Sequence, residues 1–152
     1  MKKLRVITFS DKELGSENKL LQSCKKNDLE LIVLTYHKEW WSNAIKIKLL
    51  FDYLKTVEAE QLLLITDAFD VLIHASEGDI LNAFSSLEKD IIFGAEANFY
   101  FRNHRIKKDY QAKYPESATI YKYLNSGTIM GKAVHIQMLL DDIIRKNEID
   151  IS

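Results

Sequence analysis

Two aspartates follow a short apolar run near the middle of the chain. Residues 62–65 are continuous and apolar, as expected of a strand covered on both faces, and the polar turn after them contains Asp67 and Asp70. In an open α/β sheet, ligands bind outside the carboxyl ends of the strands. Two carboxylates at such a position can share a hard divalent cation, because Mg²⁺ and Mn²⁺ prefer oxygen ligands. The alternative is structural: one aspartate caps the turn and the other is solvated.

Apolar runs alternate with amphipathic stretches along the whole chain. Short runs rich in Leu, Ile and Val predict strands at residues 4–9, 29–34, 62–66, 91–97 and 123–131. Apolar residues at helical spacing predict helices at residues 17–27, 44–57, 77–87 and 132–147. Segment 97–118 is rich in Tyr, Phe, Lys and Arg without periodicity, which predicts a long loop. This alternation predicts an α/β sandwich with a mainly parallel sheet.

The composition bounds the class of protein. A length of 152 residues, with 47% hydrophobic and 28% charged residues, fits a single globular domain. The formal net charge of −1 gives no electrostatic reason to expect nucleic-acid binding. The first apolar segment is too short for a signal peptide, and no run reaches transmembrane length. Because Cys24 is the single cysteine, no internal disulfide can form, and we expect a cytoplasmic protein.

The order of several short motifs is more specific than any one of them. Along the chain these are VITFS, EWWSN, ITDAFDVLI, FGAE, KYP and YLNSGTIMG. In this order the chain resembles the glycosyltransferase domain of the procollagen lysyl hydroxylase and procollagen galactosyltransferase group, from Lys3 to about Ile144. The resemblance implies a GT-A-like, Rossmann-like three-layer sandwich over residues 1–152, with a mainly parallel central sheet.

The resemblance also implies a reaction. In this family a sugar is transferred from a UDP-sugar, and Mn²⁺ (or Mg²⁺) bridges the diphosphate and the protein. Asp67 and Asp70 match the metal-binding acidic pair of the family. The acceptor that the resemblance implies is a hydroxyl group, on hydroxylysine or galactosyl-hydroxylysine of a collagen-like polypeptide. General chemistry agrees, because a divalent cation on the diphosphate stabilises the negative charge that develops on the departing UDP.

Further residues match positions that contact the nucleotide in the family. Phe69 stands where the family keeps an aromatic ring near the uracil, and Val6 and Thr8, expected to end the first strand, match uridine contacts. One of Trp40 and Trp41 matches a tryptophan at the donor site, where an indole face suits a sugar or a base. Each also has a structural interpretation: a core Phe, an ordinary strand-end Thr, or a Trp that covers the sheet.

Other matching residues lie near the sugar. Lys46 is aligned with a family lysine close to the nucleotide-sugar, or is a solvated helix residue. Glu96 is expected to orient a hydroxyl or to support the metal ligands, or to be a surface Glu. Asn125, Ser126 and Gly127 are expected to contact the donor or acceptor sugar, because Gly127 lacks a side chain that would block a close approach. The structural interpretation of these three is a β-bulge without a ligand.

The sequence also departs from the family pattern. The family domain continues with an acidic segment tied to acceptor binding and with a His that completes the metal shell, whereas this sequence stops at Ser152. Asp141 and Asp142 fall within the last helical pattern, so we interpret them as helix-surface carboxylates. A truncated or inactive nucleotide-sugar-binding module is therefore the main alternative to an active transferase.

Two phosphate-handling classes fit less well. Aspartyl-phosphate phosphotransferases separate their two carboxylates by one residue, whereas Asp67 and Asp70 are separated by two. A receiver-type phosphoacceptor domain would use Asp67 with Asp11 and Lys132. Its usual Lys-Pro turn is absent here, and it offers no role for the Trp pair.

Overall fold

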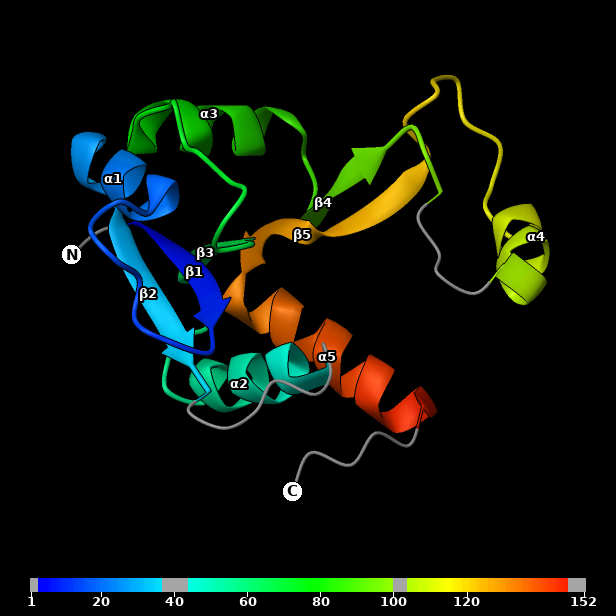
Figure 1. Cartoon of the computed structure of the whole chain (residues 1–152), viewed down its shortest axis with the longest axis horizontal. Helices are drawn as coiled ribbons and strands as arrows, with labels where there is room; N and C mark the ends of the chain where they lie inside the picture. The colour runs from blue at the N-terminus through cyan, green and yellow to red at the C-terminus, as the bar shows by residue number, and fades with distance from the viewer. Residues whose placement is uncertain (1–2, 37–43, 100–103, 148–152) are drawn as a thin grey trace.

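The computed structural model describes residues 3–36, 44–99 and 104–147. Strands and helices alternate along them in the following order: β1 (Leu4–Ser10), α1 (Lys19–Lys26), β2 (Glu30–Thr35), α2 (Ala44–Leu54), β3 (Leu62–Thr66), α3 (Glu77–Ser86), β4 (Ile91–Glu96), α4 (His104–Ala112), β5 (Tyr123–Lys132) and α5 (Ala133–Asn147) (Figure 1). Among these helices, none is long and apolar enough to cross a membrane.

The strands form one sheet in the order β2-β1-β3-β5-β4. β1 pairs in parallel with β2 and β3, whereas β5 pairs antiparallel with β3 and β4. β1 to β4 therefore share one direction, which confirms the predicted mainly parallel sheet. Because β5 is reversed, its first half lies at the carboxyl edge of the other strands, where Tyr123 pairs with Glu96 and Thr128 with Thr66. Phe93 pairs with Ile129, but the next residue, Gly94, pairs with Asn125, so residues 126–128 of β5 have no partner in β4 and form a bulge in β5.

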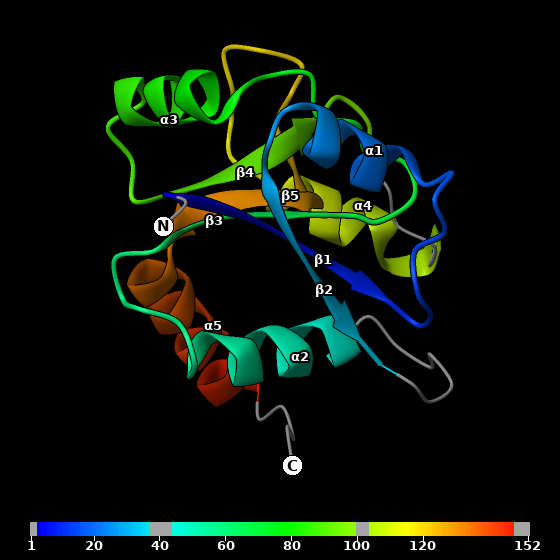
Figure 2. The ribbon, with the colours of Figure 1, turned by 90° about the vertical axis from the view of Figure 1, so that its left-hand side faces the viewer.

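Helices cover both faces of the sheet, and each face has its own hydrophobic core (Figure 2). Successive side chains of a strand point to opposite faces, so β1 contributes to both. Ile7 packs with residues of α2 and α5, whereas Val6 packs with residues of α1 and α3. Full burial of such a side chain is worth roughly 1.5–3 kcal/mol, more than a typical hydrogen bond. The two cores confirm the predicted three-layer sandwich.

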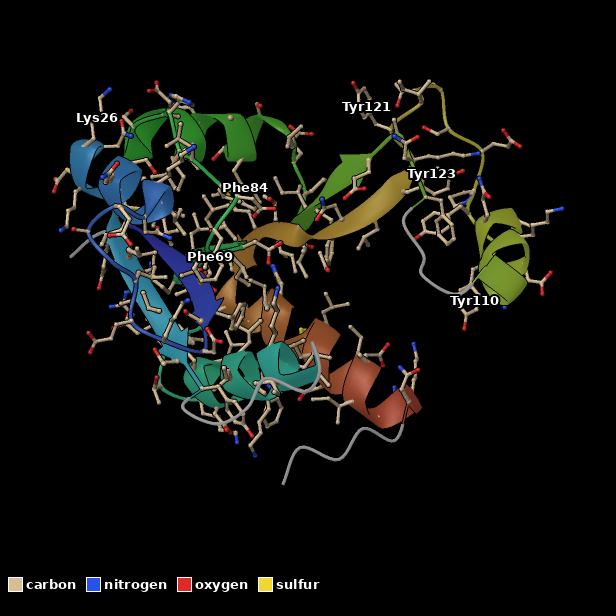
Figure 3. All side chains as sticks on the ribbon, in the orientation of Figure 1. Lys26, Phe69, Phe84, Tyr110, Tyr121 and Tyr123 are labelled. Atoms are coloured by element: carbon tan, nitrogen blue, oxygen red, sulfur yellow. The ribbon has the colours of Figure 1, made fainter. Side chains whose placement is uncertain are left out.

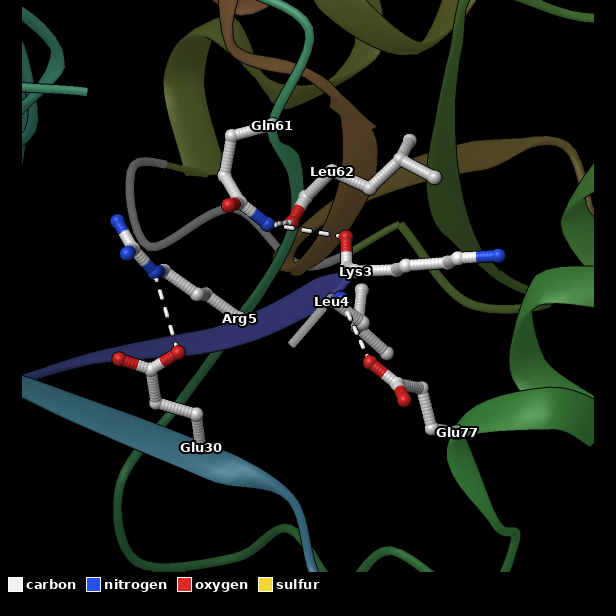
Figure 4. A network of polar contacts seen from close by, with 7 residues as sticks. All are labelled: Lys3, Leu4, Arg5, Glu30, Gln61, Leu62 and Glu77. Atoms are coloured by element: carbon white, nitrogen blue, oxygen red, sulfur yellow. Dashed lines mark hydrogen bonds and ion pairs between the residues drawn. The ribbon is translucent and has the colours of Figure 1, made fainter. Parts of the chain in front are cut away.

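Gln61 connects three segments at the amino end of β3. Its side chain is buried and donates from Nε2 to the carbonyl oxygens of Lys3 at 2.9 Å and Leu62 at 3.1 Å (Figure 4). Its own carbonyl accepts a hydrogen bond from the Ala133 N–H at 2.9 Å. Because β5 ends at Lys132 and α5 begins at Ala133, this bond holds the joint between them, which has no connecting loop.

Side chains also fasten the amino end of β1. The Leu4 N–H donates to Oε1 of Glu77 at 2.8 Å, and Nε of Arg5 lies 3.2 Å from Oε2 of Glu30 (Figure 4). Glu77 lies in the first turn of α3, whose N-cap is Ser76. A carboxylate at this end of a helix is favourable because it complements the helix dipole. The amino edge of the sheet is thus fixed to both α3 and β2.

Some sequence predictions about elements are wrong. Segment 97–118 is not one loop, because it contains α4; that helix has few apolar residues, so it leaves no periodic pattern. β5 is a continuous strand from Tyr123 to Lys132, one residue longer than predicted. β1 continues to Ser10, so Val6 and Thr8 lie inside the strand and do not end it.

Cys24 offers a test of the core between the sheet and α1. Its side chain is 1% exposed, and burial raises the pKa of its thiol to about 11. We expect a thiol reagent at pH 7.5 to label the native protein at least tenfold more slowly than the protein unfolded in urea.

The folded state also holds the thiol proton of Cys24 more tightly than the unfolded state, whose thiol has a pKa of about 9.0. The free energy of unfolding should therefore fall as the pH rises above about 9. Equal labelling rates with and without urea would contradict this core.

Candidate functional site

Polar side chains from several elements meet at the carboxyl edge of the sheet. Asp67 directly follows β3, Glu96 ends β4, and Asn125 and Gly127 lie near the start of the reversed β5. Lys46 joins them from the first turn of α2. Two adjoining cavities open at this edge, and Lys46 and Asp67 line both. The carboxyl edge is where ligands bind in open α/β sheets, so these cavities form the candidate site.

The first cavity, here called the acidic cavity, contains both predicted metal ligands. It has a volume of about 500 Å³ and is lined by Ser10, Asp11, Lys46, Asp67, Phe69 and Asp70, among others. Asp67 is half-buried and Asp70 is exposed. The Phe69 side chain is 61% exposed, so its ring is not part of the core (Figure 3). One cavity is therefore lined by Asp67, Phe69 and Asp70, so a single ligand could contact all three side chains.

Lys46 forms an ion pair with Asp67 within this site. Its Nζ lies 2.5 Å from Oδ1 of Asp67, with exposed side-chain fractions of 32% and 39%. Lys46 Nζ also lies 5.9 Å from the centroid of the Phe9 ring, within the range of a cation–π contact. Both partners are partly shielded from water, so the pair is stronger than a fully exposed one.

The carboxylates fit a divalent cation only in part. Asp67 and Asp70 offer hard oxygen ligands, as Mg²⁺ and Mn²⁺ prefer. In the described residues, however, no group of three or more His, Cys, Asp or Glu side chains is placed to hold a metal ion. Magnesium usually keeps several waters and takes substrate phosphates as ligands beside one or two carboxylates. The donor set therefore fits a cation that is held jointly with a phosphate ligand.

A chain of hydrogen bonds links Asp67 to Glu96 through β5. The Asp67 N–H donates to the Gly127 carbonyl at 3.1 Å, and the Gly127 N–H donates to Oδ1 of Asn125 at 2.6 Å. Asn125 in turn donates from Nδ2 to Oε1 of Glu96 at 2.5 Å. A Cβ atom on Gly127 would lie 2.4 Å from Oδ2 of Asp67. The position therefore requires glycine as long as the Asp67 carboxylate keeps its place.

The second cavity, here called the aromatic cavity, shares Lys46 and Asp67 with the acidic cavity. It has a volume of about 350 Å³, and its lining includes Glu96, Phe99, Tyr114, Tyr123 and Asn125. Three of its rings pack together, with centroids 5.6 Å apart for Phe99 and Tyr114, 5.2 Å for Phe99 and Tyr123, and 5.1 Å for Tyr114 and Tyr123.

Residues near α4 complete the aromatic cavity. Nε2 of Gln111 donates to the Tyr123 hydroxyl at 2.8 Å. Figure 3 shows Tyr123 at the start of β5 and Tyr110, which also lines the cavity, on α4. Aromatic faces beside amide and carboxylate groups suit a ligand with both apolar and hydroxyl-bearing surfaces.

The remaining predicted residues are placed differently. Val6 and Thr8 are fully buried, and neither lines a described cavity. Val6 packs in the core, whereas the Thr8 hydroxyl donates to the Thr66 carbonyl at 2.8 Å and so supports the end of β3. Their contact with a uridine stays a prediction. Trp40 and Trp41 lie outside the described residues. Ser126 and Gly127, in contrast, line the aromatic cavity with Asn125.

The sequence analysis missed Asn18, which supports the acidic turn. Its Nδ2 donates to the Ala68 carbonyl at 2.7 Å, and its Oδ1 accepts from the Leu21 N–H at 2.9 Å as the N-cap of α1. One side chain thus ties the turn between Asp67 and Asp70 to a helix. An Asn directly before an apolar helical pattern is a recognised N-cap signal, so the cap was readable from the sequence. Its bond to Ala68 was not, because the two residues are distant in sequence.

Comparison with known proteins identifies the family. The profile described as PLOD GT domain matches residues 1–150. The chain belongs to this glycosyltransferase domain family. Procollagen-lysine,2-oxoglutarate 5-dioxygenase of Drosophila melanogaster is 26% identical over 152 residues, which cover 93% of this chain and 20% of that protein. The multifunctional procollagen lysine hydroxylase and glycosyltransferase of Caenorhabditis elegans is 26% identical over 149 residues, 90% of this chain and 20% of that protein.

These curated relatives are much longer than this chain. The chain spans about a fifth of the length of these curated relatives. A mimivirus relative, the uncharacterized protein R699 of Acanthamoeba polyphaga mimivirus, is 23% identical over 84% of this chain and 29% of that protein. The crystal structure of A197 from STIV superposes with a TM-score of 0.51 at 16% identity, covering 91% of this chain and 66% of that one. This structural likeness supports the α/β fold.

Substitution of Gly127 tests the contact between β5 and the acidic turn. In Gly127→Ala the new methyl group would overlap Oδ2 of Asp67, so the carboxylate must move away from its present place. We expect a loss of about 1–3 kcal/mol in the free energy of unfolding, as for an overpacked site, measured by urea titration. The control is Gly78→Ala in α3, where the nearest atom to the new Cβ is Ser76 Oγ at 3.9 Å. There we expect no loss, or a gain of up to about 1 kcal/mol. Equal stability of the two variants would show that the Asp67 carboxylate can move away from Gly127 without cost, so that the contact does not contribute to the fold.

Proposed function

We propose that this chain binds a UDP-sugar in the acidic cavity together with Mn²⁺ or Mg²⁺, and transfers the sugar to a hydroxyl group of an acceptor. The observation that carries the proposal is that Asp67 and Asp70 line one cavity in a chain of a glycosyltransferase family. The fold alone would not support it, because the same α/β architecture serves many functions.

On the donor side, each residue has a defined role. Asp67 and Asp70 would hold the cation, which when bound stabilises the negative charge on the departing diphosphate. The exposed ring of Phe69 offers a flat apolar face for the base. Lys12 Nζ lies 5.9 Å from the centroid of that ring, and Lys12 and Phe69 both line a neighbouring cavity. Asn18 and Thr8 hold the turn that presents the two carboxylates.

The acceptor would enter through the aromatic cavity. Asn125 and Ser126 offer hydrogen-bonding groups, and Gly127 leaves room for close approach to the backbone. Glu96 lines the same cavity and is in place to accept a hydrogen bond from an acceptor hydroxyl. The acceptor that the sequence resemblance implies is hydroxylysine, or galactosyl-hydroxylysine, in a collagen-like chain, and the names of the relatives mention procollagen lysine. Two cavities that meet at Asp67 would bring the sugar and the hydroxyl together, which lowers the entropic part of the barrier.

A nucleotide-sugar-binding module without transfer activity is the second candidate function. It is favoured by the small donor set, because in the described residues Asp67 and Asp70 have no third His, Cys, Asp or Glu partner for a metal. Such a module would still bind the nucleotide with the cation. Binding and transfer are therefore tested by separate experiments.

Thermal melting tests the donor site. We expect UDP with Mn²⁺ to raise the Tm by several degrees, because a ligand that binds only the native state stabilises it, by about 2.7 kcal/mol at a hundredfold excess over its Kd. Asp67→Ala and Asp70→Ala should each abolish the Mn²⁺-dependent part of this shift. Asp141→Ala is the matched control, because Asp141 is an exposed carboxylate on α5 that is paired with Gln137. A full shift in both cavity variants would exclude the proposed metal ligands.

Release of UDP tests the transfer step. With Mn²⁺ and the correct UDP-sugar, we expect a hydroxylysine-containing collagen-like peptide to increase UDP release above the slow hydrolysis seen without an acceptor. Asp67→Ala should remove this increase, since the cation would then no longer be held against the leaving group. If UDP and Mn²⁺ stabilise the protein but no combination of UDP-sugar and peptide releases UDP, the non-transferring module is the correct function.

A further inference from the structure

Lys46 forms an ion pair with Asp67, one of the two carboxylates that we assign to the metal. The ion pair joins Lys46 Nζ to Oδ1 of Asp67 at 2.5 Å, and both residues line both cavities. Lys46 lies in the first turn of α2, where the positive end of the helix dipole disfavours a cation. The position of Lys46 therefore does not stabilise the helix. It serves a negatively charged group at this edge of the sheet.

The ion pair makes the site a poor one for a free cation. The charged residues that line the acidic cavity are Asp11, Asp67, Asp70 and Lys46, and the ammonium of Lys46 offsets the carboxylate of Asp67 with which it pairs. An ammonium repels a divalent cation about twice as strongly as it repels a monovalent one at the same distance. A cation that approaches Asp67 must therefore displace the lysine or bind weakly at Asp70.

A diphosphate would remove this obstacle. Lys46 has a flexible stem and three N–H donors, and it lines both cavities, so its ammonium can move from carboxylate to phosphate without backbone motion. Asp67 and Asp70 would then both be free to face the cation. The phosphate oxygens would supply the ligands that the described residues lack.

We infer that Lys46 is a placeholder for the cation: it holds Asp67 in the nucleotide-free protein and transfers to the diphosphate when the donor binds. This inference rests on the proposed function and adds the order in which the cation and the nucleotide bind. The protein then takes up the cation together with the nucleotide and not before it. Because binding free energies are reciprocal, the cation must tighten the nucleotide by the same factor as the nucleotide tightens the cation.

Mn²⁺ binding to Lys46 variants tests the placeholder role. Free Mn²⁺ is measured by electron paramagnetic resonance, with and without UDP, and each variant is first melted to show that it folds. Wild-type protein should bind Mn²⁺ weakly alone and at least tenfold more tightly with UDP. In Lys46→Met the affinity for Mn²⁺ alone should rise about tenfold, because Asp67 loses its competing ammonium. The increase in Mn²⁺ affinity that UDP causes should be smaller in Lys46→Met than in the wild type.

Two control variants test whether the effect of Lys46→Met comes from the loss of the positive charge beside Asp67. Lys46→Arg keeps the positive charge, so Mn²⁺ alone should stay as weakly bound as in the wild type. Lys55→Met removes a lysine just after α2 that pairs with Asp52 at 2.9 Å, away from both cavities, and should change neither measurement.

The outcomes distinguish this inference from the proposed function. If wild-type protein binds Mn²⁺ with UDP but Lys46→Met gains no affinity for Mn²⁺ alone, the placeholder role is wrong and the donor site stands. If neither wild type nor Lys46→Met binds Mn²⁺ with UDP, the proposed function fails, and this inference fails with it.

Discussion

The site depends on one backbone hydrogen bond, from the Asp67 N–H to the Gly127 carbonyl. It forms because β5 runs against β3, so the first half of β5 lies beside the last residue of β3. The bond brings the Asp67 carboxylate over a residue that has no side chain. Lys46 attaches to this carboxylate from one side, and Asn125 and Glu96 support the glycine from the other. Each of these contacts would lose its partner if β5 shifted in register.

The two ends of the sheet have different tasks. At the amino end, Gln61, Arg5 and Glu77 use their polar groups to join strands and helices within the protein. At the carboxyl end, polar groups line two cavities. The two hydrophobic cores between these ends supply most of the stability, because burial of apolar side chains outweighs single hydrogen bonds. A protein built this way can carry like charges at one edge, such as Asp67 and Asp70, while its fold is held elsewhere.

The sequence was sufficient for the fold class and for the position of the acidic pair. An apolar run followed by Asp67 and Asp70 reports a buried strand and its polar end, and both features are local. The direction of β5 was not readable, because residues 123–132 pair with strands that lie far away in sequence. The Lys46–Asp67 pair and the contact of Asn18 with Ala68 were missed for the same reason. The aromatic cavity was missed because its rings are spread over β5, the region of α4 and the segment between them.

The joint between β5 and α5 limits how this architecture can vary. Strand and helix meet at Lys132 and Ala133, and the Ala133 N–H is held by the Gln61 carbonyl. The turn after β3 is also tied down, because Asn18 donates to the Ala68 carbonyl. An inserted residue between β5 and α5 would turn the helix by roughly 100° about its axis and expose the side of α5 that now covers the sheet. The length of the chain at the β5–α5 joint therefore cannot change without loss of the interface between α5 and the sheet.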